Sequence, residues 1–247
     1  MQAYKKEPIS KENSIYVSQY HRFSTDTILL ADFSMPKPNE ICVDIGTGCG
    51  MIPMLWAVRS KMKKAYGIEI QEDAAVMAQE SVKLNGFEEK IEIITADVKE
   101  LKDEKLRELH LVSCNPPYKP IGSGIRSEEE AEDVARHEIS CSIEDVAKAA
   151  SMFLRFGGRL CVCQRPERLC DVMEAFRKYG IEPKRLRMVQ QRRDKKPFLF
   201  LLEGKKGGKP YLNVEPTLFV EDNNSFSEEM MKIYGDYKNS PEITGRK

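Results

Sequence analysis

The segment that decides the fold of this chain is Ile41-Cys42-Val43-Asp44-Ile45-Gly46-Thr47-Gly48-Cys49-Gly50. A short apolar run with one acidic residue leads into three alternating glycines, and helix-compatible apolar residues follow from 51 to 59. This pattern is typical of a buried strand that enters a glycine-rich loop at the start of a helix. Glycines in such a loop adopt positive φ angles and let backbone N–H groups approach a ligand closely.

Strands and helices alternate along the chain after this loop. We predict further strands at residues 65–70, 91–95, 109–114 and 159–164, and helices at residues 72–84, 142–156 and 165–179. Such alternation indicates parallel pairing with right-handed crossovers. Two extended runs, residues 185–191 and 197–202, flank a short basic turn and predict an antiparallel hairpin, so the parallel sheet ends in one reversed strand. No strong pattern follows Glu221, so we expect the remaining residues to be ordered only in part.

The overall charge gives no sign of a nucleic-acid partner, but its distribution does. Lys and Arg number 39, as do Asp and Glu, so the formal net charge is zero and a chain-wide basic footprint is absent. Residues 66–140 nevertheless carry 18 acidic and 9 basic residues, whereas residues 181–209 carry 10 basic and 3 acidic residues. A local contact with an anionic partner therefore remains open.

Cysteine content and hydropathy predict the compartment. The seven cysteines form no C-x-x-C pair and are expected to be buried small hydrophobic residues in a reducing environment. No apolar run reaches the roughly 18 residues of a membrane span, and residues 1–10 lack the apolar region of a secretory signal. The three histidines are scattered and no metal constellation is present. We expect a cytoplasmic monomer or weak dimer without a metal or a membrane contact.

The glycine spacing and three acidic residues predict the kind of cofactor. The loop has the spacing G-x-G-x-G and lacks the G-x-G-x-x-G of dinucleotide-binding proteins. A carboxylate at Asp44 repels a pyrophosphate but suits an ammonium group, and Glu69 ends the second strand, where an acid accepts hydrogen bonds from ribose hydroxyls. Both carboxylates suit an adenosine cofactor that has a cationic amino-acid part and no phosphate. S-adenosylmethionine is such a cofactor. Asp97 follows the third strand, where it faces the ligand crevice or caps the next segment.

The sequence Asn115-Pro116-Pro117-Tyr118 directly follows the fourth predicted strand. Two prolines fix the backbone and supply no N–H, so the Asn115 side chain and the Pro116 carbonyl present acceptors in a fixed place. These acceptors suit the two hydrogens of a planar amine, and the Tyr118 ring offers a face for stacking. They would raise electron density on the nitrogen as it pyramidalises toward a methyl sulfonium, so catalysis would be positional and electrostatic. A rigid proline turn is the alternative interpretation.

These motifs resemble the class I S-adenosylmethionine-dependent methyltransferases that methylate amino groups, whose signature is (N/D)-P-P-(Y/F). Over residues 41–204, and with Arg22-Phe23-Ser24-Thr25-Asp26-Thr27-Ile28-Leu29-Leu30-Ala31 and Arg165-Pro166-Glu167-Arg168-Leu169, the chain is similar to the bacterial tRNA1(Val) adenine-37 N6-methyltransferase family. The resemblance implies an α/β, Rossmann-like, doubly wound sheet of seven mostly parallel strands with a reversed terminal strand. We expect an N-terminal cap or lid (1–40), a methyltransferase domain (41–205) and a C-terminal extension (206–247).

The resemblance also implies roles for individual residues. Asp44 and the glycines would line the methionine part, Glu69 the ribose and Asp97 the adenine, while the stretch from Ser24 to Thr27 would form a lid. The implied cofactor-binding set is Ser24, Asp26, Asp44, Gly46, Thr47, Gly48, Gly50, Glu69, Ile70, Asp97, Val98 and Asn115. The implied catalytic set, which holds the target amine, is Asn115, Pro116, Pro117 and Tyr118.

A basic surface for RNA is predicted on the hairpin. Its candidate phosphate contacts are Arg185, Arg187, Arg192, Arg193, Lys195 and Lys196. The alternative is a solvated hairpin whose charges protect an edge strand. Residues 119–136, which follow the Asn-Pro-Pro-Tyr motif, are a second candidate, as a loop that closes over a flipped base.

The expected function is S-adenosylmethionine-dependent methylation of the exocyclic N6 amine of adenine in RNA, with tRNA as the favoured substrate. Glutamine N5-methylation of a protein uses the same four-residue signature, but those enzymes carry an additional N-terminal helical domain, and 40 residues precede the first strand here. Three alternatives remain: adenine methylation of DNA, guanine N2-methylation of ribosomal RNA, and a module that binds cofactor or RNA without turnover.

Overall fold

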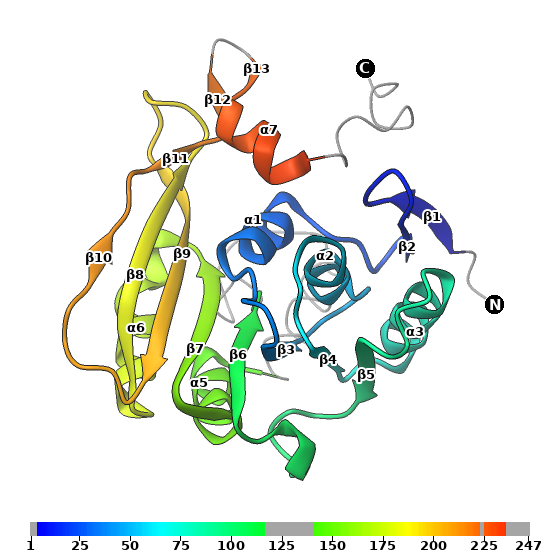
Figure 1. Ribbon diagram of the computed structural model, residues 1–247. Helices are drawn as coiled ribbons and strands as arrows, with labels where there is room; N and C mark the ends of the chain where they lie inside the picture. Colours follow the sequence, from blue (N-terminus) through cyan, green and yellow to red (C-terminus); the bar gives the residue numbers. More distant parts are fainter. Residues whose placement is uncertain (1–3, 117–140, 223–224, 236–247) are drawn as a thin grey trace, which may run out of the picture.

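The computed structural model describes residues 4–116, 141–222 and 225–235, which are built around one central sheet (Figure 1). Its seven longer strands are β3 (Ile41–Ile45), β4 (Lys64–Glu69), β5 (Ile91–Thr95), β6 (Leu109–Cys114), β7 (Leu154–Gln164), β8 (Ile181–Gln190) and β9 (Pro197–Lys206). Their spatial order is β8-β9-β7-β6-β3-β4-β5, and two short strands, β10 (Asn213–Val214) and β11 (Leu218–Phe219), add to β8. The predicted α/β fold with a mostly parallel sheet is confirmed.

The strand order reverses beside β3. From β3 the chain proceeds to β4 and β5 on one side, and it then returns to β6 on the other side. β3 pairs in parallel with both β4 and β6. In open α/β sheets, ligands bind at the carboxyl ends of the strands where the order reverses. The segments after Ile45 and Cys114 therefore emerge side by side at the expected position of a site.

The reversed strand is β9, which pairs antiparallel with both β7 and β8, as the hairpin prediction requires. It is the last of the seven strands along the chain, but it lies between β7 and β8 and leaves β8 nearer the edge. Residues 199–202 of β9 are all buried, whereas six of the ten residues of β8 are partly exposed. A strand that is covered on both faces is more stable inside the sheet, which explains this order.

Helices cover both faces of the sheet. One face packs against α1 (Thr25–Phe33), α2 (Met51–Arg59) and α3 (Glu72–Leu84), and the other packs against α5 (Ile143–Phe153) and α6 (Leu169–Lys178). Successive strand residues point to opposite faces, so Cys42 belongs to the first core and Val43 to the second. The fully buried Trp56 joins α2 to α1, because its indole N–H donates to the carbonyl of Ala31 at 3.2 Å.

The glycine pair at 157–158 lies inside β7, although the predicted helix at 142–156 and the predicted strand at 159–164 leave it between two elements. Leu154 pairs with Leu109 and Arg159 pairs with Leu111, so four residues of β7 oppose one residue of β6. Gly157 has φ 78°, a conformation that lets the chain bulge without leaving the sheet. The preceding helix consequently ends at Phe153 instead of 156.

The helix predicted at 165–179 is divided into a short 3₁₀ turn, Pro166–Arg168, and α6.

The N-terminal and C-terminal segments pack on the face of the sheet that α1, α2 and α3 cover. The hairpin of β1 (Lys5–Pro8) and β2 (Ser14–Val17) joins α3, where Ser81 Oγ accepts from the backbone N–H of Tyr16 at 2.9 Å. The C-terminal part forms a short hairpin of β12 (Glu221–Asp222) and β13 (Ser225–Phe226), followed by α7 (Glu228–Tyr234). Regular structure therefore follows Glu221 despite the weak sequence pattern. Arg59 fixes α7 by donating to the carbonyls of its last two residues at 2.7 and 3.1 Å.

Candidate active site

A cavity of about 290 Å³ opens at the carboxyl ends of the parallel strands, where the strand order reverses. Eight predicted site residues line it: Gly46, Gly48, Glu69, Ile70, Asp97, Val98, Asn115 and Pro116. Five others, Ser24, Asp26, Asp44, Thr47 and Gly50, are described but are not part of its lining. Pro117, Tyr118 and residues 119–136 lie outside the described residues. The cavity is close to the small end of the range for ligand sites.

The glycine loop forms one wall of the cavity. Gly46 and Gly48 have φ angles of 68° and 55°, and a side chain on either would meet open space. The first loop residues are held to β4, because the N–H groups of Gly46 and Thr47 both donate to the carbonyl of Ile68. Gly50 has another purpose, since a Cβ there would lie 3.2 Å from the Cβ of Ala78 in α3. Two glycines thus open the cavity and the third permits close packing.

Glu69 presents a fixed carboxylate beside this loop. One carboxylate oxygen accepts from the backbone N–H of Gly48 at 2.8 Å, and the other accepts from that of Gln71 at 3.0 Å. The residue is 5% exposed, yet it lines the cavity. Each oxygen of an ionised carboxylate has a second acceptor site, so Glu69 can also receive two hydroxyl groups from a ligand.

Asp44 lies beneath the loop and is 1% exposed. Its Oδ1 accepts from the Ser113 hydroxyl at 2.5 Å. Burial raises the pKa of Asp44 to about 7, the hydrogen bond from Ser113 opposes this shift, and the nearby charge of Glu69 adds to it. A cation in the cavity would favour the ionised form of this carboxyl group.

Asp97, Ile70 and Val98 form the wall at the ends of β4 and β5. Asp97 lines the cavity, and its Oδ1 also accepts from the backbone N–H of Lys99 at 2.9 Å. The two interpretations of Asp97 are therefore compatible, although it caps a turn and not a helix. Ile70 is 45% exposed and offers apolar surface to a planar ligand.

Asn115 follows β6 on the opposite wall, and both ends of its carboxamide have partners. Its Oδ1 accepts from the Cys163 thiol at 3.0 Å, and its Nδ2 donates to the Thr27 hydroxyl at 3.3 Å. These partners come from β7 and α1, so two elements far apart in the sequence fix the orientation of the amide. Pro116 also lines the cavity, and as a proline it has no backbone N–H.

The segment before α1 completes the lining of the cavity. The sequence prediction assigned Ser24 and Asp26 to the site but not the residues of this segment. Tyr20, His21 and Arg22 line the cavity, whereas Ser24 is the exposed N-cap of α1. His21 Nε2 lies 3.0 Å from the Asp73 carboxylate, and this hydrogen bond lowers the pKa of Asp73. Gln71 and Cys141 also belong to the lining. No local pattern identifies these residues, because they approach the site only through tertiary packing.

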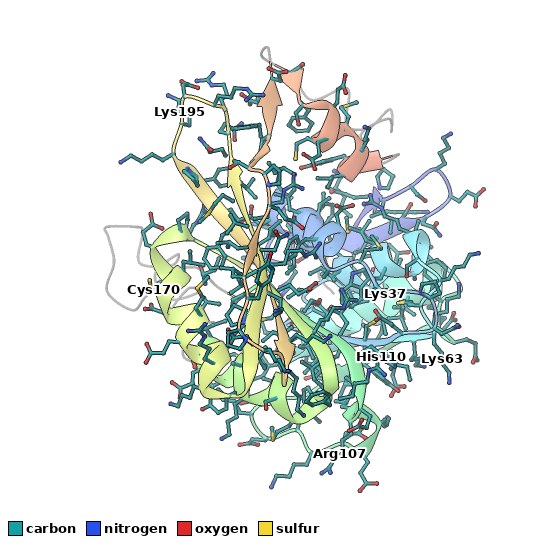
Figure 2. All side chains as sticks on the ribbon, turned by 60° about the vertical axis from the view of Figure 1, so that its left-hand side comes forward. Lys37, Lys63, Arg107, His110, Cys170 and Lys195 are labelled. Atoms are coloured by element: carbon teal, nitrogen blue, oxygen red, sulfur yellow. The ribbon has the colours of Figure 1, made fainter. Side chains whose placement is uncertain are left out.

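The basic hairpin divides into two groups. Arg185 donates to the carbonyl of Phe33 at 2.6 Å and pairs with Glu203 at 3.2 Å, while Arg187 pairs with Glu229 at 2.7 Å. These two arginines therefore hold the hairpin to the rest of the protein. The residues at the tip are all exposed: Arg192, Arg193, Lys195 and Lys196. Figure 2 shows Lys195 at this tip, well apart from Lys63 and Arg107.

The tip lies at the same edge of the sheet as the cavity. β8 runs in the direction of β6 and β7, because both β7 and β8 are antiparallel to β9. Its last residue, Gln190, therefore ends at the edge where Cys114 ends β6. In the sheet, β9 and β7 lie between β8, which leads into the tip, and β6, which ends at the cavity.

Other predicted features can be checked against the same residues. All seven cysteines are free and most are buried, but Cys170 is exposed. No group of three or more His, Cys, Asp and Glu side chains in the described ranges is arranged to hold a metal ion. Within the part of the chain that the structure describes, no helix has the length and apolar character needed to cross a membrane.

Comparison with known proteins places the chain among methyltransferases. The family model of the TRM5/TYW2 methyltransferase domain matches residues 17–115. A predicted O-methyltransferase from Agrobacterium tumefaciens shares the fold, with a TM-score of 0.68 and 21% identity over 85% of this chain and 95% of that one. Methanocaldococcus jannaschii Trm5 in complex with adenosine superposes with a TM-score of 0.56 at 18% identity, over 85% of this chain and 58% of that one.

Sequence comparison finds relatives that share one protein name, of which we describe two. The tRNA1(Val) (adenine(37)-N6)-methyltransferase of Parabacteroides distasonis is 25% identical over 218 residues, which are 87% of this chain and 90% of the relative. That of Porphyromonas gingivalis is 30% identical over 189 residues, which are 74% of this chain and 73% of the relative. The chain therefore belongs to the tRNA1(Val) (adenine(37)-N6)-methyltransferase family.

Proposed function

We propose that this protein methylates the exocyclic N6 amine of adenine 37 in tRNA1(Val), with S-adenosylmethionine as the methyl donor. The observation that carries the proposal is Asn115, whose amide lies on the wall of the cavity that also contains Glu69 and the glycine loop. A site for an adenosine-type cofactor and an acceptor for an amine thus share one cavity. The names of the relatives support adenine of tRNA as the substrate.

The residues of the cavity fit this cofactor. Gly46 and Gly48 leave open space beside the loop, Glu69 presents a fixed carboxylate that suits the ribose diol, and Ile70 offers apolar surface. A positive charge above the loop would stabilise ionised Asp44, whose pKa burial has raised. When bound, the cofactor supplies an electrophilic methyl group on a sulfonium. Phosphate would be disfavoured here, because Glu69 and Asp44 bring negative charge to the loop.

Asn115 and Pro116 act on the target amine through hydrogen bonds. The amide oxygen and the Pro116 carbonyl accept the two amine hydrogens and hold the nitrogen lone pair toward the methyl group. These bonds strengthen as the nitrogen develops positive charge, so they stabilise the transition state more than the ground state. Neither group needs to remove a proton before transfer, so the residues catalyse by position and by electrostatics.

The exposed tip of the β8–β9 hairpin is the proposed contact for RNA. Arg192, Arg193, Lys195 and Lys196 lie at the cavity edge of the sheet and are exposed, which suits contact with phosphates. Arg185 and Arg187 are assigned a supporting role, because they are only partly exposed and pair with Glu203 and with Glu229 of α7. Within the described residues, Arg192 and Lys195 pair only with Asp194, which belongs to the exposed tip itself. This surface favours a nucleic-acid substrate over a protein glutamine, which shares the amine chemistry but not the need for cations.

Replacement of Asn115 by Ala tests the proposed function. Wild-type enzyme should transfer labelled methyl from S-adenosylmethionine to unmodified tRNA1(Val), whereas Asn115→Ala should lower kcat by at least ~100-fold, as expected for a lost transition-state hydrogen bond. Asn213→Ala on the exposed strand β10 is the matched control and should retain full activity. Absence of transfer by the wild type would contradict the proposal, and an active Asn115→Ala enzyme would remove Asn115 from the mechanism.

Glu69→Gln tests the assignment of the ribose contact. The change keeps the size of the side chain but replaces one acceptor oxygen with a donor, so affinity for S-adenosylmethionine should fall by about 1–3 kcal/mol in calorimetry. Glu72→Gln provides a control, because Glu72 lies three residues away and is exposed outside the lining. Equal affinities of the two variants would place the ribose elsewhere.

Removal of charge from the hairpin tip tests the RNA surface. A variant with serine at 192, 193, 195 and 196 should bind tRNA more weakly and with a shallower salt dependence, since each lost phosphate contact removes about 0.9 from the slope of log K against log salt. The control replaces Lys61, Lys63, Lys102 and Arg107, four exposed cations at the amino ends of β4 and β6. Identical salt slopes for the two variants would exclude the tip as the contact.

A further inference from the structure

The carboxamide of Asn115 needs one orientation to work, because only its oxygen can accept a hydrogen from the target amine. Rotation of an asparagine amide by 180° exchanges a donor for an acceptor with almost no change in shape. In the other orientation an N–H group would meet the amine hydrogens. The orientation therefore depends on the groups that the amide contacts.

Cys163 is placed to select that orientation. The parallel register pairs Cys114 with Val162, which brings Cys163 beside Asn115 at the ends of β6 and β7. Cys163 is fully buried, and its thiol lies 3.0 Å from Asn115 Oδ1. A thiol is a weak donor and its sulfur is a weak acceptor, whereas an amide oxygen is a strong acceptor. The S–H···O contact is therefore better than an N–H···S contact, and the thiol favours the amide oxygen on its side. An amide oxygen has two acceptor sites, so the thiol does not exclude the amine.

Thr27 restrains the other end of the amide. Its hydroxyl accepts from Asn115 Nδ2 at 3.3 Å, and it also takes part in the cap of α1 through a contact from the Ser24 N–H at 3.4 Å. Helix α1 is in turn held from its outer side, because the Thr25 hydroxyl lies 2.8 Å from that of Tyr234 in α7. The amide is thus restrained between one strand and one helix.

We propose that Cys163 and Thr27 are positioning residues that hold the Asn115 carboxamide with its oxygen available to the target amine. This inference rests on the proposed role of Asn115 in amine methylation. Cys163 gives the cleaner test, because changes at Thr27 would also disturb the cap of α1.

The test compares Cys163→Ala, Cys163→Ser and Cys161→Ala in the full-length protein. Cys163→Ala should lower kcat about 3- to 10-fold, the effect of one lost hydrogen bond, with unchanged KM for S-adenosylmethionine and tRNA. Cys163→Ser should restore kcat, because a hydroxyl can donate to the same oxygen. Cys161 is equally buried two residues earlier on the same face of β7, so Cys161→Ala controls for lost packing and should keep the wild-type kcat.

Two kinetic outcomes would overturn the inference: a Cys163→Ala enzyme with the same kcat as Cys161→Ala, or a Cys163→Ser enzyme as slow as Cys163→Ala. A second measurement does not depend on turnover. The side-chain amide signals of Asn115 in ¹H–¹⁵N spectra should be one sharp pair in wild type and Cys163→Ser, and broadened or doubled in Cys163→Ala. Identical spectra in all three would refute the positioning role, whereas an inactive wild type with the expected spectra would contradict only the proposed function.

Discussion

The parallel pairing of β3 with both β4 and β6 is the constraint on which the rest of the structure depends. The chain leaves β3 toward one side and returns on the other, so the segments after Ile45 and Cys114 diverge and leave a cavity between them. The glycine loop can turn at once toward β4, where Ile68 accepts its first two N–H groups and Glu69 accepts from Gly48. Asn115 reaches the same cavity because β6 lies on the other side of β3.

The net charge of this protein is zero, but acidic and basic side chains are concentrated in different parts of the structure. Burial raises the pKa of Asp44 above its ordinary value, so the native state retains its proton longer than the unfolded chain. The stability contributed by Asp44 therefore falls as pH rises from about 4 to about 7. A cationic ligand above the loop would offset that loss, which is consistent with a sulfonium donor. At the same edge of the sheet, the hairpin tip carries exposed cations, which we propose contact the RNA.

Much of the fold could be predicted from the sequence, because local hydrophobic patterns and glycine positions determine most of the strands and helices. The bounds of β3, β5, β6, α2 and α3 match the predicted ranges, and eight predicted site residues line the cavity. The differences have a common cause in long-range packing. Gly157 and Gly158 form a bulge inside a strand because β6 fixes the register on both sides of them. The sequence does not distinguish Arg185 and Arg187 from the cations of the tip, because the ion pairs that hold them to Glu203 and Glu229 form only in the folded chain. For the same reason the lining by Tyr20, His21 and Arg22, and the thiol beside Asn115, could not be predicted.

The reaction proposed for this cavity is methylation of N6 of an adenine in tRNA, with Asn115 holding the amine. Mass spectrometry of nucleosides from purified tRNA1(Val) tests it directly, in a wild-type strain, a gene-deletion strain, and deletion strains that express either the wild-type gene or Asn115→Ala. We expect N6-methyladenosine at position 37 in the wild type, its loss in the deletion strain, and its return with the wild-type gene but not with the variant. Undiminished N6-methyladenosine at that position in the deletion strain would show that another enzyme methylates this adenine and would refute the proposed function.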